Sequence, residues 1–129
     1  MEITFNGGKV VMANAGGHTI MTDQPLDNGG TNSAPAPFDL YLASIGTCAG
    51  IYVKSFCDRR NIPSDKIKIL QKTEFDNQTR LPAIISLEIN VPEDFPEKYR
   101  DALINAAELC AVKKSIANPP VFKISTAVK

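Results

Sequence analysis

The feature that most constrains this chain is a run of uncharged residues, 40–53, inside a stretch with helical periodicity. Apolar residues recur at spacings of three, four and seven between Phe38 and Phe56, which predicts a helix that begins at Pro37. The opposite side also lacks charge until Lys54, and a helix that is apolar nearly all round is buried. In a small chain this burial requires strands or a second subunit. Because the run is shorter than the roughly 20 residues that span a membrane, we expect a core helix.

Strand signals lie on both sides of this helix. Before it, turns containing glycine at residues 6–8 and 16–17 separate three short strand-like segments, which predicts an antiparallel meander. After it, residues 67–75 and 81–91 alternate apolar and polar side chains, which predicts two long strands. Residues 23–36 are rich in Gly, Pro, Asn and Asp and predict a long loop, a kind of segment that often carries function.

The last third of the chain predicts a second helix whose apolar face includes Tyr99 and Cys110. Helix is expected to resume over Ala111–Ala117, and residues 122–128 alternate as a last strand does. Strands, a long helix, two strands, a helix and a strand make an α+β fold rather than alternating β-α-β units.

Composition limits the partners that the chain can have. Fourteen Lys and Arg residues balance fourteen Asp and Glu residues, so the formal net charge is zero. Binding to nucleic acid or to an anionic membrane needs a basic surplus, so we predict neither partner. No secretory signal is recognisable after Met1. We therefore expect the protein in the cytoplasm, where thiols stay reduced. The length of 129 residues predicts a single domain, residues 1–129.

Three cysteines are an odd number, which argues against a disulfide framework. Cys48 lies on the apolar stripe of the first helix and Cys110 ends the apolar face of the second. Their thiols could meet if their Cα atoms lie within about 7 Å. Cys57, nine residues after Cys48, lies on the opposite side of that helix. The residues alone leave open whether Cys48 and Cys110 are a redox pair or small buried hydrophobes.

Metal and cofactor motifs are not recognisable. His18 is the only histidine, and no Cys-x-x-Cys or His-x-x-x-His spacing accompanies it, so no metal site is predicted. The glycine pairs match neither a dinucleotide-binding motif nor a P-loop. Lys113 and Lys114 could lower the pKa of a nearby thiol, but an ordinary solvated turn is the favoured interpretation of the two lysines.

Two segments resemble the OsmC/Ohr family, which comprises osmotically inducible protein C and the organic hydroperoxide resistance proteins. The first is GGTNSAPAPFDL at residues 29–40, running into LASIGTCAG at 42–50, with Cys48 eleven residues after Pro37 as in the family. The second is AAELCAVKKSI at residues 106–116, which is similar to the family's second cysteine site. The order and separation of the two motifs also agree.

The resemblance implies an OsmC-like fold, in which antiparallel sheets wrap around a long buried helix in an intertwined homodimer with sites at the subunit interface. It also implies a thiol peroxidase for oxidative-stress defence, without metal or cofactor. In that activity Cys48 attacks an organic hydroperoxide or H2O2, and Cys110 resolves the sulfenic acid as a disulfide. An external dithiol would be the reductant.

The chain departs from the family pattern at two supporting positions, as in the less characterised OsmC-like branch. The family's peroxidases carry a glutamate after the helix-start proline and an arginine near the first hairpin, whereas Phe38 follows Pro37 here and Arg59 is the first arginine. Lys9 and His18 are candidates for polar support. Without a cation, we expect an apolar pocket to raise the pKa of Cys48.

A second hypothesis is a non-enzymatic dimer that binds a small molecule or senses thiol oxidation. Its pocket would be lined by Phe38, Tyr41, Tyr52 and the two cysteines.

Overall fold

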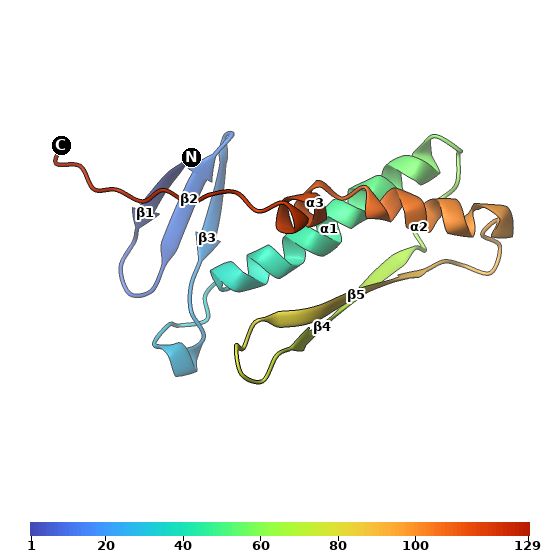
Figure 1. Ribbon diagram of the computed structural model, residues 1–129. Helices are drawn as coiled ribbons and strands as arrows, with labels where there is room; N and C mark the ends of the chain where they lie inside the picture. The colour runs from blue at the N-terminus through green and yellow to red at the C-terminus, as the bar shows by residue number, and fades with distance from the viewer. The chain divides into compact units, whose positions relative to one another are not determined.

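The computed structural model describes residues 1–129, which form two compact units, residues 1–44 and 45–129 (Figure 1). The N-terminal unit holds strands β1 (Glu2–Phe5), β2 (Val11–Ala15) and β3 (His18–Thr22). They pair antiparallel in the order β1-β2-β3, which confirms the predicted meander. The turns place Gly7 and Gly16 at φ 82° and 57°, a backbone conformation that glycine adopts at little cost.

The long loop after β3 is folded around one carboxylate. Asp23 is 1% exposed, and its Oδ2 atom accepts hydrogen bonds from the backbone N–H and the hydroxyl of both Thr31 and Ser33. Its Oδ1 atom accepts from the Gln24 N–H at 2.8 Å. These bonds, those from Ser33 first, hold the pKa of Asp23 well below its usual range. The loop also contains a 3-10 turn, η1 (Leu26–Asn28).

Two glycines are expected to respond in opposite ways to alanine. A Cβ atom at Gly30 would lie 1.9 Å from the backbone oxygen of Gln24, so Gly30→Ala is expected to destabilise the protein by about 1–3 kcal/mol. A Cβ at Gly50, inside helix α1 (Pro37–Asp58), would meet only the Ile69 side chain, at 3.9 Å. Gly50→Ala is expected to add up to about 1 kcal/mol. Urea unfolding of both variants checks the two signs, and equal effects would contradict the close approach at Gly30.

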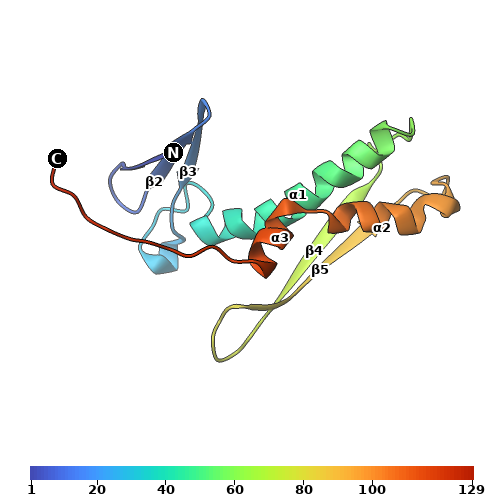
Figure 2. The ribbon, with the colours of Figure 1, turned by 45° about the horizontal axis from the view of Figure 1, so that its top comes forward.

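The C-terminal unit packs the rest of α1 against a hairpin and two helices. Strands β4 (Lys68–Phe75) and β5 (Pro82–Asn90) pair antiparallel, as predicted. Helix α2 (Arg100–Glu108) follows a 3-10 turn, η2 (Glu97–Tyr99), and α3 (Ala111–Ala117) follows α2 after a break. Figures 1 and 2 both show α1 and α2 lying over the hairpin. The buried core consists of Ala49, Val53, Phe56, Cys57, Phe95, Leu103 and Ala107.

Helix α1 is buried along one stripe only. Ile45, Ala49, Val53, Phe56 and Cys57 are buried, whereas Ile51 on the other side is 58% exposed. Burial on every side, which the apolar pattern predicts, is therefore not confirmed in the single chain. By length and composition α1 could also cross a membrane, with a mean hydropathy of 1.3, a property that core helices of soluble proteins share.

The predicted last strand is wrong for the single chain. Residues 118–129 follow α3 without regular structure, and the apolar side chains of Val121, Phe122 and Ile124 are more than 80% exposed. The alternating pattern is present, but a strand also needs a neighbour that accepts and donates its backbone hydrogen bonds. No strand of the chain pairs with this segment.

Candidate thiol site

The structure brings Cys48 and Cys110 together within the C-terminal unit. Cys48 lies in the middle of α1 and is half-buried, and Cys110 is fully buried at the break between α2 and α3. Both thiols are free, and the Cys110 thiol is a hydrogen-bond donor to the Cys48 sulfur. The two cysteines that the sequence left as a possible pair are thus neighbours in the structure.

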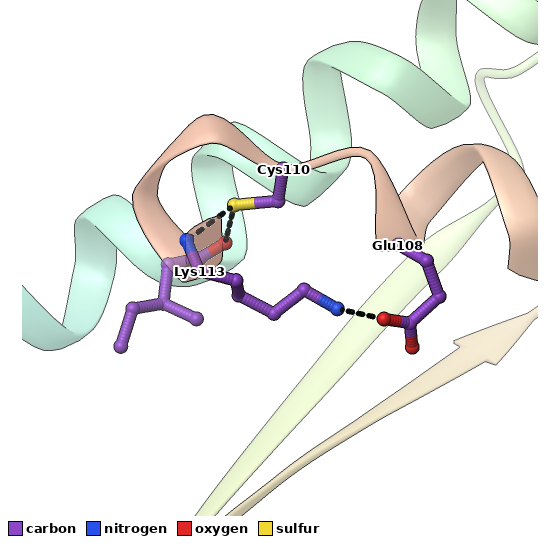
Figure 3. Close-up of polar contacts among 4 residues, drawn as sticks. Glu108, Cys110 and Lys113 are labelled. Carbon is purple, nitrogen blue, oxygen red and sulfur yellow. Dashed lines mark hydrogen bonds and ion pairs between the residues drawn. The ribbon is translucent and has the colours of Figure 1, made fainter. Parts of the chain in front are cut away.

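Cys110 is held by contacts on both sides of its sulfur (Figure 3). Its Sγ atom accepts a hydrogen bond from the Lys113 backbone N–H at 3.4 Å, which caps the start of α3. The Ile45 carbonyl oxygen of α1 lies 3.8 Å from the Cys110 Sγ atom and is a second acceptor for the single S–H of this thiol, alternative to the Cys48 sulfur. These contacts fix the second thiol against the helix that carries the first.

The electrostatic environment of Cys48 differs from the sequence-based expectation. Hydrogen bonds from the Val112 backbone N–H, from the Cys110 thiol and from the Ala111 backbone N–H lower the pKa of Cys48 and outweigh the effect of burial. The prediction of a raised pKa was wrong because it considered only side-chain cations. Backbone N–H groups stabilise a thiolate in the same way, without a formal charge.

The two lysines after Cys110 do not act on the thiol by charge. The Lys113 ammonium forms an ion pair with the Glu108 carboxylate at 2.6 Å (Figure 3), and no side-chain charge contributes to the lowered pKa of Cys48. Lys113 therefore contributes its backbone N–H to Cys110, while its side chain is used elsewhere.

The other predicted site residues divide between the two units. Lys9 and His18 are exposed in the N-terminal unit, the latter at the first position of β3. Phe38 and Tyr41, also in that unit, pack against each other with ring centroids 5.2 Å apart and ring planes tilted by 48°. Tyr52 is half-buried on the part of α1 that belongs to the C-terminal unit. The roles predicted for these residues remain predictions.

Cys57 lies in the hydrophobic core and is fully buried. Burial raises the pKa of its thiol, which makes it a poor nucleophile. This environment fits a structural role for Cys57.

Sequence reasoning missed the backbone donors of Ala111 and Val112. Alanine and valine carry no recognisable chemistry, so residue type gives no signal. A signal does exist in the predicted break before residue 111, because the first N–H groups of a helix have no partner within it. No three His, Cys, Asp or Glu side chains lie together in a way that could hold a metal ion.

Comparison with known proteins gives a family match and several similar structures. The family model described as OsmC-like protein matches residues 30–125, more than half of the chain. No curated protein matches in sequence.

The similar structures share the fold over most of the chain. One, from Psychrobacter arcticus 273-4, carries a provisional description as an osmotic stress induced and detoxification response protein; it has a TM-score of 0.75 at 22% identity, covering 88% of this chain and 85% of its own. The organic hydroperoxide resistance protein OsmC of Legionella pneumophila has a TM-score of 0.54 at 17% identity, covering 89% and 87%. The organic hydroperoxide resistance protein OhrB of Bacillus subtilis also reaches 0.54, at 22% identity, covering 91% and 90%.

Proposed function

The chain belongs to the OsmC-like protein family, and we propose that it is a cysteine-based thiol peroxidase of that family that reduces organic hydroperoxides or H2O2. One observation carries the proposal: the Cys48 sulfur receives hydrogen bonds from the Val112 and Ala111 backbone and from the Cys110 thiol, and its pKa is lowered. A thiolate is the nucleophilic form of cysteine, and a second thiol within hydrogen-bonding reach is what a resolving cysteine requires.

The reaction that fits this geometry has two steps. The Cys48 thiolate attacks one peroxide oxygen, the O–O bond breaks, and the other oxygen leaves with a proton as an alcohol, or as water from H2O2. Cys48 is thereby oxidised to a sulfenic acid. The Cys110 thiol then attacks the Cys48 sulfur, which forms a disulfide and releases water. An external dithiol would reduce this disulfide and itself become a disulfide.

Mass spectrometry of the protein after one equivalent of cumene hydroperoxide tests this assignment. We expect one dominant product, a disulfide between Cys48 and Cys110, with Cys57 still free because it is buried. In Cys110→Ser the same treatment should leave a sulfenic acid at Cys48 that dimedone labels. An unmodified chain, or oxidation spread over methionines and Cys57, would contradict the proposal.

A thiol-sensing dimer is the second candidate function. It is favoured by the absence of any side-chain charge among the groups that lower the Cys48 pKa, since efficient turnover gains from a nearby cation. A sensor would form the same disulfide, but with dithiothreitol present its steady-state peroxide consumption would scarcely exceed that of dithiothreitol alone. Steady-state peroxide consumption with that dithiol separates the two candidates.

We also propose that the protein acts as a homodimer in the cytoplasm, a compartment that keeps thiols reduced. The support is the apolar surface that the single chain leaves uncovered, on α1 around Ile51 and along the segment from Val121 to Val128. An alternating apolar segment without a partner strand is suited to pairing with another chain.

Substitutions in that segment test the dimer. Phe122→Ser together with Ile124→Ser is expected to weaken dimerisation by at least about a hundredfold, because each buried side chain of this kind contributes about 1.5–3 kcal/mol. Lys123→Ser, on the other face of the alternating pattern, is the matched control and should remain dimeric. Light scattering after size-exclusion chromatography gives the mass. A wild-type monomer, or a double variant that dimerises normally, would contradict the proposal.

A further inference from the structure

A cavity of about 560 Å³ lies in the C-terminal unit, between the segment that follows α1 and the connection from β5 to α2. This volume is in the range of small-molecule sites. No cysteine lines the cavity. Helix α1 ends at Asp58, ten residues after Cys48, which places that end about 15 Å along the axis from the thiol. The cavity is therefore separate from the thiol site.

Arg60 supplies a cation in a fixed orientation at the wall of this cavity. The guanidinium carbon lies 3.7 Å from the centroid of the Phe56 ring and 5.4 Å from that of Tyr99, and Nη1 donates to the Phe56 carbonyl oxygen at 3.2 Å. Arg60 has no carboxylate partner, because the two ion pairs of the chain are Lys54–Asp58 and Lys113–Glu108. Most of its five N–H donors are therefore free for a planar acceptor such as a carboxylate.

The charges around the cavity favour an anion with a single charge. Arg60, Lys66 and Lys98 are opposed by Asp65 and Asp94, which leaves one net positive charge. A multiply charged anion would be repelled by the two carboxylates, whereas one carboxylate can pair with Arg60.

The remaining walls favour a flat apolar body. The aromatic ring of Tyr99, the side chain of Phe95, which is 4% exposed, and the rings of three prolines complete the lining. Proline rings carry no N–H group and present rigid apolar surfaces.

We propose that this cavity binds a small aromatic carboxylate, whose carboxylate pairs with the Arg60 guanidinium while its ring packs against the Tyr99 and proline walls. The site is independent of the peroxidase proposed above, since it shares no side chain with the Cys48–Cys110 pair.

Titration of the full-length protein with 2-naphthoate, followed by NMR, tests the proposal. We expect saturable binding whose chemical-shift changes map to residues 60–66 and 92–99, and weaker binding of the neutral 2-naphthamide. Arg60→Gln should weaken 2-naphthoate by about ten- to a hundredfold and leave 2-naphthamide unchanged. Arg59→Gln is the matched control. Because Arg59 does not line the cavity, this variant should retain the wild-type affinity for 2-naphthoate. Cys48→Ser should also bind normally.

The binding of 2-naphthamide to Arg60→Gln shows whether that variant keeps the cavity intact. The proposal is overturned if 2-naphthoate does not bind the wild-type protein, or if its shifts map elsewhere. It is overturned equally if Arg60→Gln weakens both compounds alike, or if Arg59→Gln weakens 2-naphthoate as much as Arg60→Gln does.

Discussion

Replacing Cys48 by serine is expected to lower the rate of hydroperoxide consumption by more than about a thousandfold, because a hydroxyl cannot replace the thiolate as nucleophile at neutral pH. The groups that donate to Cys48 belong to the backbone and to Cys110, so they are unchanged in the serine variant. Because the serine hydroxyl can accept from the same donors, the variant should keep the same fold. Cumene hydroperoxide consumption with dithiothreitol as reductant measures the effect.

Cys57→Ala is the matched control for this experiment. Cys57 belongs to the core cluster, which includes neither Cys48 nor Cys110. Its replacement by alanine should therefore leave the rate within about twofold. The free energy of unfolding should fall by about 1 kcal/mol. If Cys57→Ala abolished consumption and Cys48→Ser did not, the assignment of the nucleophile would be wrong.

The pH dependence of the same reaction follows from the sign of the pKa change. A lowered pKa means that the thiolate persists to lower pH than in a free cysteine, so the rate should rise with pH and level off below the range in which an unperturbed thiol ionises. Removing the Cys110 donor in Cys110→Ala should move this inflection to higher pH. Initial rates of Cys48 oxidation in single-turnover experiments give the profile. An inflection at the ordinary thiol pKa would show that the hydrogen bonds do not act on Cys48 in solution.

Local chain patterns predicted much of this fold because its elements are specified locally. Gly7 and Gly16 adopt the positive φ values that their turns require, and the alternation after residue 67 matches the registered pair of β4 and β5. The phase of Cys48 and Cys110 on two apolar helix faces made a meeting of the two thiols possible but did not decide it, and Cys110 in fact lies in the break before α3 rather than on α2.

The sequence failed where the outcome depends on partners rather than on residue type. Residues 122–128 have a strand pattern, but pairing requires a second strand, and the single chain provides none. The Cys48 pKa depends on the Val112 and Ala111 N–H groups, which every residue except proline possesses. The break before α3 was predicted at residue 111, but the effect of these N–H groups comes from its packing against Cys48 of α1, a tertiary contact that residue types do not specify.

The loop of residues 23–36 is expected to lose its structure when Asp23 is replaced by alanine. Five donors converge on this carboxylate, which is 1% exposed: two N–H groups and two hydroxyls of Thr31 and Ser33, and the Gln24 N–H. Without the carboxylate these five donors lose the one group that holds residues 24, 31 and 33 together, so the segment should open. Amide hydrogen exchange at Thr31 and Ser33 should accelerate by at least about a hundredfold.

Asp23→Asn separates the charge of this group from its shape. The amide keeps one acceptor oxygen, which can serve the four donors of Thr31 and Ser33, but its NH2 group then faces the Gln24 N–H, so a smaller opening of the loop is expected than in Asp23→Ala. Lowering the pH should open the loop of the wild-type protein, as these substitutions do. Because the Asp23 pKa is lowered on folding, its contribution is fully present above the unfolded value and is lost as the pH falls below about 4. Exchange rates measured between pH 7 and pH 3 should therefore rise relative to the intrinsic rates in the wild type and stay flat in Asp23→Asn. A variant with wild-type protection would show that the carboxylate does not hold the loop.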